Sequence, residues 1–235
     1  MAASKHVAVL MGGWSSEREV SLRSGAACAA ALESRGYRVT RIDVQRDIAT
    51  VLAGLKPDVA FMALHGRPGE DGTIQGVLET LAIPYTHSGV LASSLAMQKD
   101  LAKTVMATAG VPVAEGLTLS RAEIAKGHVM KPPYVIKPVA DGSSVGVFIV
   151  TEEHAHPPQE LFRDGWPHGD RLLVEKYVAG RELTCAVIKG EPSEVTEIVP
   201  LLKFYDYEAK YSKGASKHVL PAPILPFVYQ EVRRL

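Results

Sequence analysis

The chain has 235 residues, 46% of them hydrophobic, which is enough for two compact domains or one large one. Basic and acidic residues both number 26, and no basic tract or aromatic–basic stripe occurs, which argues against nucleic acid as the main partner. The two cysteines are far apart and form neither a disulfide framework nor a metal-ligand pair, and no apolar run is long enough for a signal peptide or a membrane span. We therefore expect a cytoplasmic protein with no membrane partner.

Strands and helices alternate over the first ninety residues. Ser16-Glu17-Arg18-Glu19 has the form of a capping box, which predicts a helix with Ser16 as its N-cap and Gly36 as its stop. Hydrophobic patterns predict strands at 6–10, 39–44 and 59–64 and helices at 48–55 and 74–81. This order predicts a parallel sheet with helices on both faces.

The predicted elements change in the second half of the sequence. Ser120 and Glu123 form a second capping box, and Pro226 opens a helix whose apolar face needs a partner. Hairpin-like strands are predicted at 134–137, 145–150, 172–178 and 183–188. These features predict an α+β region with antiparallel sheets. We divide the chain into an N-terminal α/β domain (1–89), a central subdomain (90–178) and a C-terminal subdomain (179–235).

Two candidate site residues follow strands of the predicted parallel sheet, whose carboxyl ends form the usual ligand crevice. Glu17 comes just after Gly12-Gly13, and its carboxylate can hold an ammonium or orient a hydroxyl. The alternative is that it only favours the helix dipole. His65 begins the turn 65–72 and can donate to a carboxylate or phosphate oxygen. The alternative for His65 is a solvated histidine in a surface turn.

A lysine followed by a loop of small residues is the most informative motif. Lys137 ends a strand and precedes a loop in which Gly142 and Gly146 allow backbone N–H groups to approach an anion. This is equipment for holding a phosphoryl group, although the spacing of a P-loop is absent. A plain hairpin with a glycine–serine turn is the alternative.

Two further segments carry candidate binding residues. Main-chain groups of Lys176, Tyr177 and Val178 offer an edge that an adenine ring can read, with Glu182 left for ribose hydroxyls; a solvated strand of mixed polarity is the alternative. Residues 204–217 combine three tyrosines with several lysines, as in a lid that closes over an anionic substrate. An exposed loop with scattered aromatic residues is the alternative there.

Taken together, these segments resemble D-alanine–D-alanine ligases of the ATP-grasp superfamily. The resemblance runs in order along nearly the whole chain and rests on the segments Gly12–Leu22, Leu64–Gly66 with Gly69–Gly72, Met97–Asp100, Ile136–Pro138, Asp141–Val147, Glu175-Lys176 with Glu182, and Phe204–Tyr211. Each motif is weak alone, but seven in this order are highly specific. The resemblance implies a Rossmann-like N-terminal domain followed by an ATP-grasp region.

The resemblance also implies an activity, namely ATP-dependent joining of two D-alanine molecules through an acyl phosphate for peptidoglycan synthesis. Glu17 would hold the ammonium of the first D-alanine, and His65 would steady acyl-phosphate oxygens. The catalytic residues would be Glu17, Ser143, Tyr211 and Lys210. Ser143 and Tyr211 would also bind substrate, in one hydrogen-bonded set with Glu17. ATP would be held by Lys99, Lys137, Ser143, Ser144, Glu175, Lys176, Tyr177, Val178, Glu182 and Lys210. Tyr211 further favours an amine over a D-lactate hydroxyl as nucleophile.

The resemblance departs from the family pattern at the end of the chain. The family continues beyond the position of Leu235 with a segment whose acids and asparagine bind two Mg²⁺ (or Mn²⁺) ions, so we assign no metal ligand to these 235 residues and expect them alone to have negligible activity. Another ATP-grasp carboxylate–amine ligase and a non-catalytic nucleotide-binding remnant are the alternatives. We expect D-alanine and ATP to bind to this protein, and a homodimer is the oligomeric state that we consider.

Overall fold

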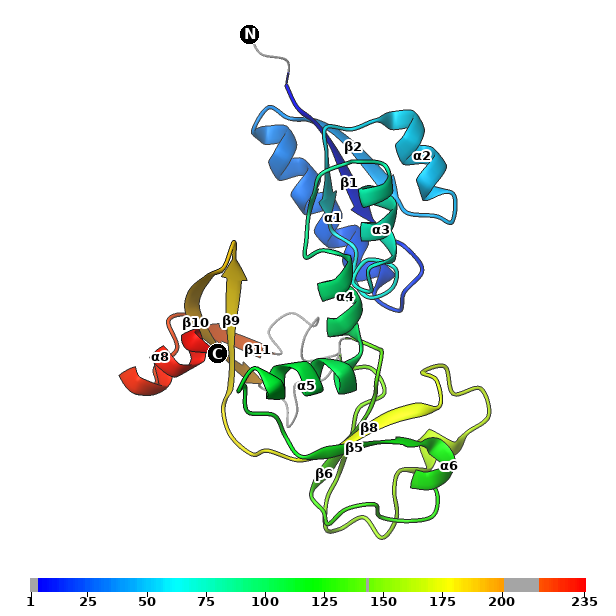
Figure 1. Ribbon diagram of the computed structural model, residues 1–235, viewed down its shortest axis with the longest axis vertical. Coiled ribbons are helices and arrows are strands. Elements are labelled where there is room, and N and C mark those ends of the chain that lie inside the picture. Colours follow the sequence, from blue (N-terminus) through cyan, green and yellow to red (C-terminus); the bar gives the residue numbers. More distant parts are fainter. Residues whose placement is uncertain (1–3, 143, 201–215) are drawn as a thin grey trace. The chain divides into compact units, whose positions relative to one another are not determined.

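The structure is a computed structural model that describes residues 4–142, 144–200 and 216–235 (Figure 1). The strands in this part of the chain are β1 (His6–Met11), β2 (Arg38–Asp43), β3 (Val59–Met62), β4 (Tyr85–Thr86), β5 (Gly116–Ser120), β6 (Tyr134–Pro138), β7 (Phe148–Val150), β8 (Arg171–Lys176), β9 (Glu182–Ile188), β10 (Glu191–Pro200) and β11 (Ser216–Val219). The helices are α1 (Arg18–Ser34), α2 (Ile48–Leu55), α3 (Thr73–Thr80), α4 (Val90–Met97), α5 (Lys99–Thr108), α6 (Arg121–Ile124), the 3₁₀ helix η1 (Gln159–Phe162) and α8 (Pro226–Arg234).

Residues up to Ala102 form one compact unit, and residues from Lys103 onward form a second. The three-part division of the sequence stays a prediction. None of the helices in the described ranges combines the length and the apolar character that crossing a bilayer requires.

The first unit is built on a parallel sheet with the strand order β2-β1-β3-β4. Alternate residues of β1 point to opposite faces, and both faces are buried. Val7 and Val9 pack in one cluster with Ala29 of α1, whereas Ala8 and Leu10 pack in another that α2 and α3 complete. The predicted parallel sheet with helices on both faces is therefore confirmed.

The strand order places a switch point between β1 and β3. From β1 the chain passes to β2 on one side, and it then returns to β3 on the other side of β1. In open α/β sheets, ligands usually bind beyond the carboxyl ends of the strands at such a switch point. Glu17 follows β1, and His65 follows β3.

The start of α1 differs from the prediction. Glu17, not Ser16, is the N-cap residue, and no side chain caps the helix. The neighbouring Ser15 hydroxyl instead accepts a hydrogen bond from the Glu17 N–H at 3.1 Å and donates to the His65 carbonyl oxygen at 2.7 Å. A contact with a loop fifty residues away therefore sets the beginning of this helix, and such a contact leaves no mark in the local sequence.

The second unit contains two antiparallel sheets, with orders β5-β8-β6-β7 and β11-β10-β9, which confirms the predicted antiparallel strands. One face of the first sheet forms a core in which Tyr134 and Ile136 of β6 meet Leu172 and Val174 of β8. The predicted strand at 145–150 is shorter than expected, because Gly146 has a φ of 68° and β7 begins only at Phe148.

Local signals define two helices of this unit as predicted. Ser120 and Glu123 form the complete capping box at the start of α6, and Pro226 is the first residue of α8. Helix α8 packs against β10, and its Tyr229 hydroxyl accepts a hydrogen bond from the Val195 N–H at 3.0 Å. On the predicted apolar face of α8, Val228 and Val232 are half-buried, whereas Leu235 is 47% exposed.

Candidate functional site

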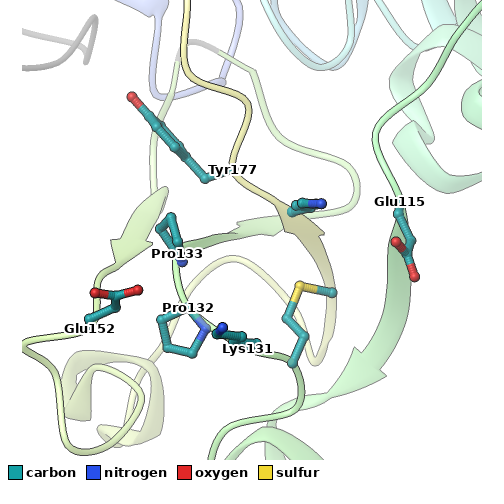
Figure 2. A pocket seen from close by; sticks show the side chains of 8 residues that line it. Glu115, Lys131, Pro132, Pro133, Glu152 and Tyr177 are labelled. Carbon is teal, nitrogen blue, oxygen red and sulfur yellow. The ribbon is translucent and has the colours of Figure 1, made fainter.

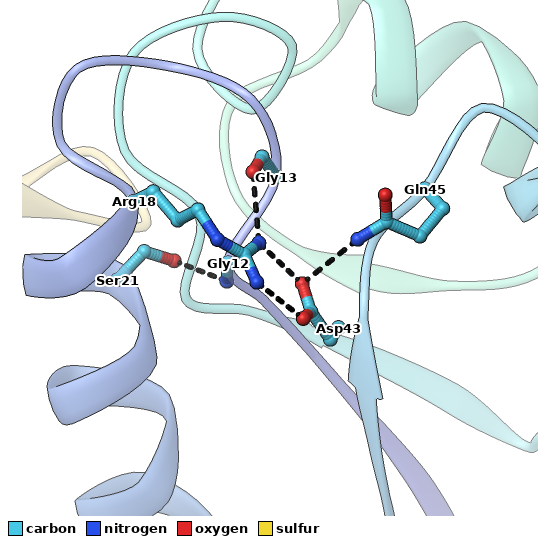
Figure 3. Close-up of polar contacts among 6 residues, drawn as sticks. All are labelled: Gly12, Gly13, Arg18, Ser21, Asp43 and Gln45. Atoms are coloured by element: carbon cyan, nitrogen blue, oxygen red, sulfur yellow. Dashed lines mark hydrogen bonds and ion pairs between the residues drawn. The ribbon is translucent and has the colours of Figure 1, made fainter.

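In the first unit, a pinned glycine turn links β1 to α1 (Figure 3). Gly12 and Gly13 have φ angles of 75° and 77°, a left-handed conformation that favours glycine. The Gly12 N–H donates to the Ser21 hydroxyl at 2.9 Å, and the Arg18 guanidinium donates to the Gly13 carbonyl oxygen at 2.9 Å. A Cβ on Gly12 would lie 2.2 Å from a carboxylate oxygen of Asp43, so a larger residue would displace the side chains of the ion pair.

The ion pair between Arg18 and Asp43 holds this turn against β2. Two N–H groups of Arg18 donate to the two carboxylate oxygens of Asp43, both at 2.6 Å. The hydrogen bond from Arg18 lowers the pKa of the Asp43 carboxyl below its ordinary value and raises that of the guanidinium. The pair is partly exposed, so its main effect is geometric: a bidentate bond fixes the residue that follows Glu17.

Glu17 and the turn that follows β3 lie together. The Glu17 side chain is buried, at 5% exposure, and a Cβ on Gly66 would lie 3.2 Å from its Oε2. The Ser15 hydroxyl bridges the Glu17 N–H and the His65 carbonyl oxygen. The structure therefore brings Glu17 and His65 to the same edge of the parallel sheet, at the switch point between β1 and β3.

The turn after β3 is held by side chains of its own neighbourhood. The Gly66 N–H donates to the Glu70 carboxylate at 3.0 Å, and the fully buried Gln75 amide donates to the Gly69 carbonyl oxygen at 2.6 Å. The His65 Nε2 lies 3.4 Å from the Ser24 hydroxyl of α1. These contacts fix a tight turn that faces Glu17 and orient the His65 ring.

In the second unit, three charged side chains meet on the face of the sheet opposite the core. Strands β6 and β8 pair Val135 with Glu175, which places Lys137 and Glu175 on one face. The Lys137 ammonium donates to Glu175 Oε1, and the Lys103 ammonium donates to Glu175 Oε2 at 2.6 Å. Lys103 also donates to the Ala114 carbonyl oxygen at 2.6 Å. All three charged side chains are at least three-quarters buried.

The two ammonium groups keep Glu175 ionised. Burial alone would raise the pKa of the Glu175 carboxyl, but hydrogen bonds and charge from Lys103 and Lys137 outweigh it and leave the pKa below its ordinary value. The cluster has two positive charges and one negative charge, and therefore a net charge of about +1. An anion near Lys137 would meet a net positive charge.

The small-residue loop after Lys137 is braced from one side. The Asp141 carboxylate lies 2.6 Å from the His168 Nδ1. A Cβ on Gly146 would come within 3.2 Å of His168 and of the Trp166 ring. Ser144 has a φ of 59°, so the backbone turns sharply there. The predicted residue Ser143 lies outside the described residues.

The proposed adenine edge is already partly occupied by main-chain bonds. The Lys176 N–H donates to the Glu115 carbonyl oxygen at 2.8 Å, and the Tyr177 N–H donates to the Pro133 carbonyl oxygen at 3.2 Å. A main-chain donor for an adenine ring would thus have to come from Val178, which is 72% exposed. Glu182 is the exposed first residue of β9.

A cavity of about 510 Å³ lies at this end of the sheet, where β8 ends and β5 and β6 begin (Figure 2). Tyr177 and Pro133 line it beside two acids and two lysines. The charged members of the lining are Glu115, Lys131, Glu152 and Lys176. This mixture of charges suits a polar ligand group better than an apolar one.

The remaining predicted residues are placed as follows. Lys99 is the first residue of α5, and Lys210 and Tyr211 lie outside the described residues. Sequence reasoning missed Ser15, Lys103 and His168, whose partners are distant in the chain. Across residues 4–142, 144–200 and 216–235, no group of three or more histidine, cysteine, aspartate or glutamate side chains could hold a metal ion.

Comparison with known proteins shows two family models that match this chain. Residues 105–235 match the family model described as D-ala D-ala ligase C-terminus, and residues 50–88 match the one described as D-ala D-ala ligase N-terminus. A D-alanine–D-alanine ligase of Afipia carboxidovorans is 88% identical over the whole chain, and one of Xanthobacter autotrophicus is 67% identical over 99% of it. The chain spans 76% of the length of each of these two relatives.

Solved structures of ligases also match this chain in fold. A D-alanine–D-alanine ligase from Bacillus anthracis matches with a TM-score of 0.79 and 30% identity, over 98% of this chain and 76% of that one. The same enzyme complexed with ATP matches at 0.76 and 26%, over 98% and 75% of the two chains. The VanG D-Ala:D-Ser ligase from Enterococcus faecalis matches at 0.74 and 28%, over 99% and 80%.

Proposed function

Because this chain belongs to the D-alanine–D-alanine ligase family of ATP-dependent ligases, we propose that it joins two D-alanine molecules through an acyl phosphate. The observation that carries the proposal is the identity of 88% to a named ligase over all 235 residues. The buried carboxylate of Glu17 at the switch point adds physical support, because an amino acid's ammonium needs such a partner when it leaves water.

The reaction has two steps. A carboxylate oxygen of the first D-alanine attacks the γ-phosphorus of ATP, which gives D-alanyl phosphate and ADP. The amine of the second D-alanine then attacks the acyl carbon, phosphate leaves with the C–O bond electrons, and the amine loses a proton. The enzyme contributes mainly by positioning the reactants and stabilising their charge.

In this proposal, the first unit binds the amino acid. Glu17 holds the ammonium of the first D-alanine, and His65 donates to oxygens of the acyl phosphate. The contacts of Ser15 and the turn at Gly66 support these roles, because they hold both residues at one edge of the sheet. Ser143 and Tyr211 complete a hydrogen-bonded set with Glu17 in the same proposal, and both stay predictions.

We assign the nucleotide to the second unit together with Lys99. The phosphates are bound by Lys99, by Lys137 and by the loop that holds Ser143 and Ser144, with Lys210 at the γ-phosphate. The net positive charge of the Lys137 cluster and the sharp backbone turn at Ser144 support this assignment. Adenine contacts Glu175, Lys176, Tyr177 and Val178, and Glu182 binds the ribose.

Several finer features rest on family membership alone. A role in peptidoglycan synthesis and cell shape, a cytoplasmic location, a homodimeric assembly and a requirement for Mg²⁺ or Mn²⁺ all belong to the proposal.

A second candidate differs only in the nucleophile. The likeness to a D-Ala:D-Ser ligase makes D-serine the specific alternative as the second amino acid. Competition between equal concentrations of D-alanine and D-serine, with the dipeptides separated by mass spectrometry, distinguishes the two. Predominant D-alanyl-D-serine would overturn the proposed substrate while leaving the ligase reaction in place.

The decisive experiment follows the oxygen atoms. The protein is incubated with ATP and D-alanine that carries ¹⁸O in its carboxylate. We expect one ¹⁸O per dipeptide to appear in inorganic phosphate, because the acyl phosphate transfers that oxygen. The matched control is L-alanine, which should give neither dipeptide nor labelled phosphate. Dipeptide formation with unlabelled phosphate would rule out the acyl phosphate.

A further inference from the structure

We propose that Lys103 is a positioning residue for nucleotide binding, which neutralises Glu175 so that the charge of Lys137 remains available to a phosphate group. The inference rests on the proposed function, because it takes ATP as the anion. Lys103 lies outside the motifs found in the sequence, and its side-chain contacts are what support this role.

Lys103 is built to hold Glu175. Its ammonium donates to Glu175 Oε2 and to the Ala114 carbonyl oxygen, both at 2.6 Å, so two bonds fix its position. Only 18% of the Lys103 side chain and 13% of the Glu175 side chain are exposed. A charge pair this sheltered from water is screened far less than a surface pair.

The backbone also brings Glu175 close to the strand that follows α5. Gly116 of β5 pairs with Glu175, and a Cβ on Gly116 would lie 2.8 Å from the Glu175 Cβ and 2.7 Å from the Val174 carbonyl oxygen. Only glycine permits this approach. The close approach of β5 leaves Ala114, two residues earlier, within reach of the same lysine that binds Glu175.

Charge counting gives the consequence. With Lys103 present, one carboxylate faces two ammonium groups, and the cluster is net positive. Without Lys103, Glu175 and Lys137 would form a neutral pair, and Lys137 would attract an anion less strongly. An ammonium has three N–H donors, so Lys137 can bind Glu175 and a phosphate oxygen at the same time.

The test compares two ligands that differ in phosphate alone. Isothermal titration calorimetry gives the Kd of ATP and of adenosine, without added divalent metal, for the unaltered chain and for Lys103→Met. We expect ATP affinity to fall about tenfold and adenosine affinity to change less than about threefold, since only ATP has the charge that the cluster attracts. Lys126→Met, at an exposed lysine of the same unit, is the matched control and should change neither Kd.

A double variant separates charge from scaffolding. In Lys103→Met/Glu175→Gln the carboxylate is gone, so Lys137 regains its net charge and the ratio of ATP to adenosine affinity should return to within about threefold of the unaltered value. An equal loss for both ligands in Lys103→Met, or no recovery in the double variant, would overturn the inference alone. Failure of the unaltered chain to bind ATP both without and with added Mg²⁺ would overturn the proposed function as well.

Discussion

Replacing Gly66 by alanine tests how closely the turn after β3 approaches Glu17. Gly66 has a φ of 61°, a conformation that costs an L-residue about 1–2 kcal/mol, partly offset by about 0.4–1 kcal/mol from restriction of the unfolded chain. The new Cβ would also lie 3.0 Å from the Ser15 Cβ and 3.2 Å from Glu17 Oε2, so both must shift by a few tenths of an ångström. Relieving that crowding adds about 1 kcal/mol.

Gly36→Ala is the matched control, because Gly36 has a φ of 84° and a Cβ added there would meet nothing within 4 Å. Urea unfolding followed by circular dichroism should show Gly66→Ala less stable than Gly36→Ala by about 1 kcal/mol. Calorimetry should show D-alanine affinity about tenfold weaker in Gly66→Ala alone, because Glu17 and the Ser15 bridge are displaced. Equal stability of the two variants with unchanged D-alanine affinity would refute the reasoning.

Two further predictions concern stability. Asp43→Asn should remove a pH-dependent contribution to the free energy of unfolding. Because Arg18 lowers the pKa of Asp43, the ion pair stabilises the native chain fully above the ordinary pKa of 3.8, and this stabilisation is lost as the pH falls through the pKa of the folded state. The difference in urea midpoint between the two proteins should therefore shrink as the pH falls below about 4, and a difference that grows there would contradict the assignment. Ile136→Ala, at a fully buried core position, should lower the free energy of unfolding in urea by about 2–5 kcal/mol. Val187→Ala, at a residue that is 66% exposed, should lower it by less than about 1 kcal/mol. Similar losses in the two variants would contradict the core described for β6 and β8.

The sequence predicts the elements best where a local pattern decides them. Helix α2 spans the predicted residues 48–55, because two buried positions four residues apart define its inner face and Pro57 follows its end. The capping box at Ser120 is likewise complete within four residues. Contacts over a long range decide the rest: the beginning of α1 depends on the bond between Ser15 and His65.

The residues of the candidate site likewise divide into those that a sequence motif predicts and those that only the fold brings together. Glu17 and Lys137 stand in recognisable motifs, and the structure shows what surrounds each of them. Lys103 has no motif, because its partner Glu175 is 72 residues further along the chain and only the pairing of β5 with β8 brings them together. Ser143, Lys210 and Tyr211 lie outside the described residues, so their roles stay predictions.

The order of the strands in the parallel sheet also bears on how this protein can change. The switch point between β1 and β3 exists because the chain reverses its direction of winding there, whichever side chains fill the two loops. Residues 12–17 and 65–72 contact each other across this point, because Ser15 bonds to His65 and a Cβ on Gly66 would crowd Glu17. A change in one loop therefore also affects the other loop and the stability of the fold. In this half of the molecule, the position of the Glu17 carboxylate and the stability of the fold therefore cannot be altered independently.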